Sequence, residues 1–135
     1  MPKITFKKNR LLKQDYTFEV EPGESILHVA SEHGVPVGSN CGGVCGCSTC
    51  HVYVAQGYDA LEEMEDKEED RLDLAFDVRL TSRLGCQTKI PEDEDLVVDI
   101  SEESLKAFFD ENPAIRKQYE ATGVFELVPG AGHHH

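Results

Sequence analysis

The segment from Cys41 to His51, CGGVCGCSTCH, places four cysteines within ten residues and intersperses three glycines among them. A fifth cysteine, Cys86, is separated from Cys50 by 35 residues and lies in the segment SRLGCQ. Cysteines crowded in this way form disulfides, bind a structural zinc ion or hold an iron–sulfur cluster. The segment therefore constrains the fold more strongly than any other part of the 135-residue chain.

Disulfides and zinc both fit these cysteines poorly. Five is an odd number, and the N-terminus lacks an apolar signal core, so we expect a cytoplasmic protein with reduced thiols. A structural zinc site uses two separated cysteine pairs. Here only Cys47 and Cys50 form a C-x2-C pair, and Cys86 has no cysteine close to it in the sequence.

An iron–sulfur cluster fits the segment better. Four thiolates that hold two ferric ions and two sulfides carry negative charge, which backbone N–H groups must stabilise. A loop that folds tightly around such an anion needs residues with unusual backbone freedom. Gly42, Gly43 and Gly46 provide that freedom within the cysteine segment.

Composition restricts the partners. The chain has 26 acidic and 13 basic residues and a net charge of −13, which argues against nucleic acid and favours basic protein partners. No apolar run approaches the ~20 residues that span a bilayer, so we expect no membrane segment.

Hydrophobic periodicity predicts an α+β domain with a mixed sheet and a crossing helix. The first helix is expected within 23–37, with Ser25 as N-cap and Gly34 near its end. The other predicted elements are a hairpin of strands at 3–8 and 16–22, a strand at 51–57, a helix at 66–76 with Leu72, Ala75 and Phe76 inward, and a buried strand at 96–100.

The chain changes character after Ile100. Residues 101–123 read as two short helices with a break at Asn112–Pro113, and Leu105, Phe108 and Phe109 are expected to pack back on the domain. The predicted organisation is a domain at 1–100, a C-terminal helical extension at 101–132 and a tag remnant at 133–135.

Several segments together resemble the adrenodoxin-like 2Fe-2S ferredoxins, and the bacterial Isc-type members most of all. Without Cys45, the cysteines follow the pattern C-x5-C-x2-C and then, after 35 residues, C. The resemblance covers about residues 2–100 and is carried by MPKITF, PGESIL, CSTCHV, GYDAL, DRLDLAF, SRLGCQ and EDEDLVVDI.

The resemblance implies a β-grasp ferredoxin fold with a cluster-binding loop near the surface. It implies one 2Fe-2S cluster whose ligands are Cys41, Cys47, Cys50 and Cys86. Cys45 is then a non-ligand thiol, which either fills tight space or reacts beside the cluster. For His51, the resemblance implies a hydrogen bond that links the cluster loop to the second helix.

The second predicted helix lies in an acidic stretch, with nine acids and two bases from Asp59 to Asp73. Such a run is either a solvated face or a docking site. In the family that the chain resembles, this helix docks basic patches on the reductase and on electron acceptors. The matching positions are Asp66, Asp70, Asp73 and Phe76, whereas Lys67 stands where an acid is usual.

We therefore predict a one-electron carrier and not an enzyme. It is expected to be a monomer in the bacterial cytoplasm, to accept electrons from a ferredoxin reductase with a basic face, and to pass them to the iron–sulfur cluster assembly machinery. One alternative acceptor is a haem monooxygenase system. A more distant alternative is a non-redox interaction module that binds zinc.

Overall fold

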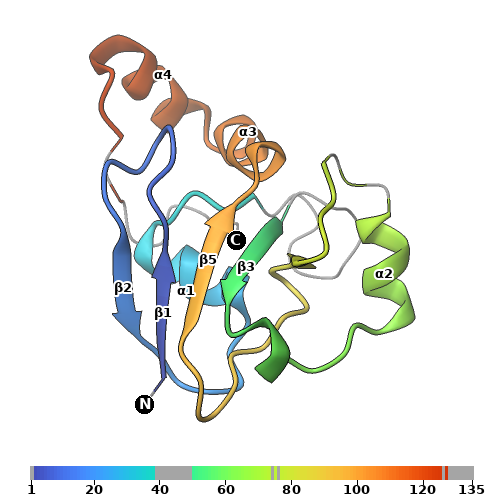
Figure 1. Ribbon diagram of the computed structural model, residues 1–135. Helices are drawn as coiled ribbons and strands as arrows, with labels where there is room; N and C mark the ends of the chain where they lie inside the picture. The colour runs from blue at the N-terminus through green and yellow to red at the C-terminus, as the bar shows by residue number, and fades with distance from the viewer. Residues whose placement is uncertain (1, 39–49, 74, 76, 126, 128–135) are drawn as a thin grey trace.

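The computed structural model describes residues 2–38, 50–73, 75, 77–125 and 127. Its centre is a five-stranded sheet in the order β2-β1-β5-β3-β4 (Figure 1). The strands are β1 (Lys3–Phe6), β2 (Tyr16–Glu19), β3 (His51–Gln56), β4 (Ser82–Leu84) and β5 (Leu96–Ile100). β1 and β5 are parallel and the other pairs are antiparallel, so the sheet is mixed and the predicted α+β class is confirmed.

Helix α1 (Ile26–His33) lies behind the sheet in Figure 1 and forms the core with it. The Ser25 side chain accepts a hydrogen bond from the His28 N–H at 3.0 Å, as an N-cap does. The helix ends at Gly34, whose φ of 72° is left-handed and favours glycine. Both predicted ends of this helix are confirmed. Its apolar side chains are buried in the same core cluster as the sheet residues Ile4 and Val98.

Strand β5 alternates, with Leu96, Val98 and Ile100 buried and the two residues between them half-buried. The sequence predicts a buried strand here, and one face of the strand is fully buried while the other is partly covered. β4 was not predicted, because three residues with two polar side chains carry no periodic signal. β4 is a strand because it pairs with β3, in a register that places His51 opposite Leu84.

Helix α2 (Asp66–Leu72) is shorter than predicted. The Ala75 N–H bonds to the Leu72 carbonyl at 2.9 Å, which closes a tighter turn than an α-helical one. The Tyr53 hydroxyl then donates to the Asp77 carbonyl at 2.7 Å, and Asp77 has a φ of 57°. This contact draws the chain back toward β3, and the helix ends at Leu72.

Helices α3 (Glu102–Glu111) and α4 (Pro113–Thr122) follow β5 directly. Leu105, Phe108 and Phe109 are at most 6% exposed and join the core cluster, so the predicted packing of this region is confirmed. Figure 1 shows α3 across the end of the sheet at which β5 finishes. None of the described helices is long and apolar enough to cross a membrane.

Candidate metal centre

Cys50 and Cys86, two of the four predicted ligands, lie side by side. Cys50 directly precedes β3 and Cys86 follows β4 by two residues, so the antiparallel pairing of these strands brings the two thiols together. The Cys86 N–H donates to the Cys50 sulfur at 3.5 Å. Cys50 is buried, whereas Cys86 is half-buried. The other three cysteines and Gly42, Gly43 and Gly46 lie outside the described residues.

Gly85 allows this close approach. Its N–H donates to the Cys50 carbonyl at 2.9 Å, and its carbonyl accepts from the Leu27 N–H of α1 at 3.0 Å. A Cβ atom at this position would lie 3.2 Å from the Cys50 carbonyl oxygen, which is tighter than ordinary van der Waals contact. Gly85 therefore joins α1, β3 and the Cys86 segment through their backbones.

Two N–H groups point at the cysteine sulfurs. Besides the Cys86 N–H, the side-chain amide of Gln87 donates to the Cys86 sulfur at 3.7 Å. Such donors stabilise thiolate charge and favour the binding of a metal cluster. Two thiols brought together from distant parts of the chain, each with an N–H donor, fit an iron–sulfur cluster.

The first turn of α3 holds the chain on both sides of residues 39–49. The Ser104 hydroxyl accepts from the Gly38 N–H at 2.8 Å, and the Ser101 hydroxyl donates to the His51 carbonyl at 2.6 Å. Ser101 is also the N-cap of α3, since it accepts from the Ser104 N–H at 3.1 Å. Both serines are buried. A helix from the predicted extension thus supports the ends of the predicted cluster loop.

Among the described residues, the His51 ring bonds to β4 and not to α2, so the structure does not support the predicted link to the second helix. Its Nε2 lies 2.8 Å from the Ser82 hydroxyl at the start of β4. Burial lowers the His51 pKa to about 4, and the ring is therefore neutral near pH 7. Nδ1 lies 3.8 Å from a Glu103 carboxylate oxygen. This carboxylate favours the tautomer with its proton on Nδ1, which leaves Nε2 to accept from Ser82.

Glu68 and Arg83 form a buried ion pair that the sequence analysis missed. Glu68 lies on α2 and accepts from Arg83 Nε at 2.7 Å and from Nη2 at 3.0 Å. It also accepts from the Leu84 N–H at 3.1 Å, and Arg83 donates to the Glu62 carbonyl at 2.9 Å. The spacing of the residues could have predicted the burial of Glu68. Glu68 precedes the inward Leu72 by four residues and therefore lies on the same face of the helix.

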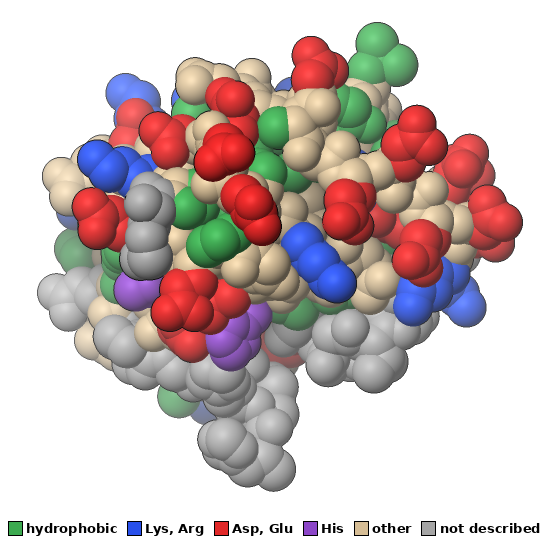
Figure 2. Space-filling view, turned by 90° about the horizontal axis from the view of Figure 1, so that it is seen from below, with side chains coloured by type: hydrophobic (Ala, Val, Ile, Leu, Met, Phe, Trp, Pro, Cys, Tyr) green, Lys and Arg blue, Asp and Glu red, His purple; other side chains and the backbone are tan. Residues whose placement is uncertain are grey.

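The predicted docking acids Asp66, Asp70 and Asp73 are all exposed on or at the end of α2. Their spacing of four and three residues places them on one side of the helix. Lys67 is exposed as well, and Phe76 lies outside the described residues. Figure 2 shows one face of the molecule, on which acidic side chains clearly outnumber basic ones.

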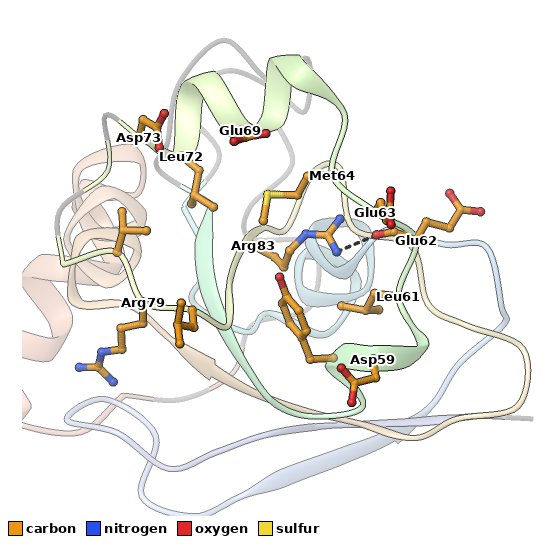
Figure 3. A pocket seen from close by; sticks show the side chains of 13 residues that line it. Asp59, Leu61, Glu62, Glu63, Met64, Glu69, Leu72, Asp73, Arg79 and Arg83 are labelled. Carbon is orange, nitrogen blue, oxygen red and sulfur yellow. Dashed lines mark hydrogen bonds between the residues drawn. The ribbon is translucent and has the colours of Figure 1, made fainter.

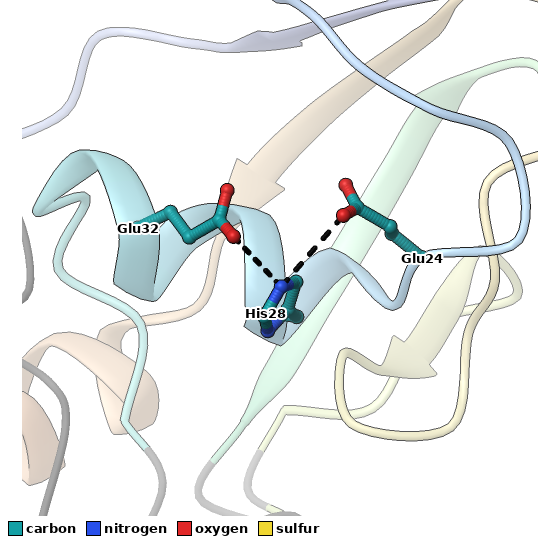
Figure 4. A group of neighbouring side chains, drawn as sticks. All are labelled: Glu24, His28 and Glu32. Atoms are coloured by element: carbon teal, nitrogen blue, oxygen red, sulfur yellow. Dashed lines mark ion pairs between the residues drawn. The ribbon is translucent and has the colours of Figure 1, made fainter.

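A second group of potential ligands lies on α1 and just before its start (Figure 4). His28 Nε2 is 2.8 Å from Glu32 and 3.7 Å from Glu24. Each glutamate lies four residues from His28, which is the spacing of ion pairs on the surface of a helix. His33 stacks on Phe18 with ring centroids 4.0 Å apart.

A mixed sheet in which two neighbouring strands bring thiols together, one just before β3 and one just after β4, is typical of iron–sulfur electron carriers. The model of the 2Fe-2S iron-sulfur cluster binding domain matches residues 9–91, and the chain belongs to this family. It is 51% identical over 96 residues to the mitochondrial adrenodoxin homolog of Saccharomyces cerevisiae, covering 69% of this chain and 54% of that protein. The chain thus spans about half the length of this yeast relative.

Bacterial proteins match over more of their length. The 2Fe-2S ferredoxin of Haemophilus influenzae is 41% identical over 106 residues, which cover 78% of this chain and 93% of that protein. The ISC-like 2Fe-2S ferredoxin FdxB of Pseudomonas putida has a TM-score of 0.71 at 44% identity, covering 76% and 94% of the two chains. Putidaredoxin in its covalent complex with putidaredoxin reductase has a TM-score of 0.63 at 27% identity, covering 73% and 96%.

These likenesses confirm the predicted family and the β-grasp fold. The chain is a 2Fe-2S ferredoxin of the adrenodoxin type, an electron carrier rather than an enzyme, with a single 2Fe-2S cluster. The cluster supplies one-electron redox chemistry when bound, and the protein controls its burial, its hydrogen bonds and its contact with partners.

Proposed function

We propose that Cys41, Cys47, Cys50 and Cys86 hold the cluster. The observation that carries this proposal is the meeting of Cys50 and Cys86, which have N–H donors at 3.5 and 3.7 Å from their sulfurs. A buried Cys50 and a half-buried Cys86 would keep one side of the cluster from water and leave another near the surface. That position suits transfer of an electron to a docked protein.

The electron is proposed to come from a ferredoxin reductase and to go to the iron–sulfur cluster assembly machinery. The likeness to putidaredoxin, whose covalent complex with its reductase is known, supports the reductase. The likeness to an ISC-like ferredoxin supports the acceptor. The carrier is proposed to be a monomer in the bacterial cytoplasm, and size-exclusion chromatography with light scattering would test the monomer.

Asp66, Asp70 and Asp73 are proposed to dock the basic face of the reductase. All three are exposed and share one side of α2, and this helix is tied by Glu68 and Arg83 to β4, which leads to Cys86. A basic surface would be attracted to them over the screening length of about 8 Å at physiological ionic strength. This attraction would speed association.

Charge reversal tests the docking site. In stopped-flow measurements at low salt, Asp70→Lys with Asp73→Lys should slow reduction by the reductase about tenfold, and the loss should shrink as salt is added. Glu19→Lys with Glu21→Lys is the matched control. Both glutamates are exposed, one at the end of β2 and one two residues after it, at the opposite edge of the sheet from β4, and the two double variants change net charge equally. Equal losses in both variants would contradict a localised site.

The acceptor is tested by reconstitution. The reduced protein should support cluster formation on a scaffold protein by a purified assembly system, whereas it should not sustain turnover of a haem monooxygenase from the same organism. The reverse result would establish the alternative acceptor.

A further inference from the structure

A hollow of about 560 Å³ lies between α2 and the 3-10 helix η1 (Tyr58–Ala60) (Figure 3). Met64 and Leu72 point toward its centre, and the turn before β4 closes one side. The apolar side chains that line it are Tyr58, Leu61, Met64, Leu72, Val78 and Leu80. The hollow therefore gathers six apolar side chains in one place on a strongly acidic protein.

Leu80 and Val78 leave much apolar surface in water at this hollow. Leu80 is 96% exposed and Val78 is 44% exposed. Among the large hydrophobic residues that the structure describes, only Val124 is also exposed, at 39%. Two of these three side chains thus line one hollow. Apolar surface gathered in this way marks an interaction site more often than a single exposed leucine does.

The edge of the hollow carries negative charge. The carboxylates that line it are those of Asp59, Glu62, Glu63, Glu69 and Asp73. The two arginines there already have partners. Arg83 is buried against Glu68, and Arg79 pairs with Asp77 at 3.1 Å while lying 4.3 Å over the Tyr53 ring. The hollow thus presents an apolar floor inside an acidic edge.

We propose that this hollow receives an apolar side chain that the reductase presents between lysine or arginine residues. The inference rests on the docking of the reductase proposed above and names the chemistry of the contact. The basic residues would face the acidic edge while the apolar side chain covers Leu80 and Val78. Asp73 belongs to both the hollow and the docking acids, so the two surfaces are continuous.

Other occupants fit this surface less well. Nucleic acid and anionic membranes would be repelled by the acidic edge. A second copy of this chain would bring a net charge of −13 against another −13. A basic protein segment uses both the charge and the apolar floor.

The test measures binding of the oxidised holoprotein to the reductase that reduces it, by isothermal titration calorimetry at low and at high salt. Leu80→Asn should weaken binding about tenfold at both salt concentrations, because salt does not screen an apolar contact. Leu80→Met keeps the apolar surface and should bind like the wild type. Val124→Asn is the matched control, since it removes the other exposed apolar side chain and lies outside the hollow.

The outcomes separate this inference from the proposal on which it rests. If Leu80→Asn binds normally while the Asp70→Lys and Asp73→Lys variant binds weakly, the reductase docks by charge alone and the inference is wrong. If neither variant weakens binding, the docking site itself is wrong. An equal loss in Val124→Asn would show a general effect of apolar surface and would also overturn the inference.

Discussion

Replacement of Glu68 by glutamine should destabilise the protein far more than its place in an acidic stretch of the sequence suggests. Glu68 is 2% exposed and accepts three hydrogen bonds, two from Arg83 and one from the Leu84 N–H. Glutamine retains one acceptor oxygen but places an NH2 group against the guanidinium. Arg83, whose side chain is 4% exposed, then keeps a buried charge without a counter-ion.

The size of the effect follows from the burial of the pair. Removal of one partner from a buried ion pair costs about 3–5 kcal/mol, and the remaining amide oxygen places Glu68→Gln near the lower value. For a chain of this length, about 3 kcal/mol lowers the melting temperature by about 10 °C. Because Leu84 precedes Cys86 by two residues, the loosened strand should also release the cluster faster.

The assay is thermal unfolding followed by far-UV circular dichroism, together with the decay of visible cluster absorption at a fixed temperature. Glu69→Gln is the matched control, since it is the next residue, is exposed and loses the same charge, and it should change stability by less than about 0.5 kcal/mol. Glu68→Gln with Arg83→Met removes both charges and should recover much of the loss. A melting temperature unchanged by Glu68→Gln, or a double variant less stable than the single one, would refute this reasoning.

Two further predictions concern the cluster and its support. Cys86→Ser should abolish the visible absorption of the cluster and the S = 1/2 EPR signal of the reduced protein, whereas Cys45→Ser should retain both; loss of the cluster in the Cys45 variant would contradict the proposed ligands. Ser104→Ala leaves the buried Gly38 N–H without its partner, which costs about 1–3 kcal/mol, and should speed cluster loss measured by absorbance. Thr122→Ala, which removes an exposed hydroxyl on α4, is the control, and equal rates in both variants would show that α3 does not support the loop.

The amino-acid sequence by itself determined those features whose signals lie within a few residues of one another. Ser25 and Gly34 mark the ends of α1, because a cap acts on backbone groups only one turn away. Asn112 and Pro113 separate α3 from α4 for the same local reason. Cysteine spacing indicated the kind of metal centre, because ligand distances along the chain restrict which cluster it can hold.

Only the tertiary structure decided which distant groups meet. Ser104 lies 66 residues from Gly38 and Ser101 lies 50 residues from His51, and no local pattern pairs them. The hydrogen bond of His51 goes to β4 instead of α2, because the pairing of β3 with β4 places Ser82 beside the ring. Glu68 is buried although it lies in an acidic run, because Arg83 reaches it from β4 and offsets the cost of removing its charge from water. Periodicity and capping depend on neighbours along the chain, whereas burial and pairing depend on the packing of the whole sheet and its helices.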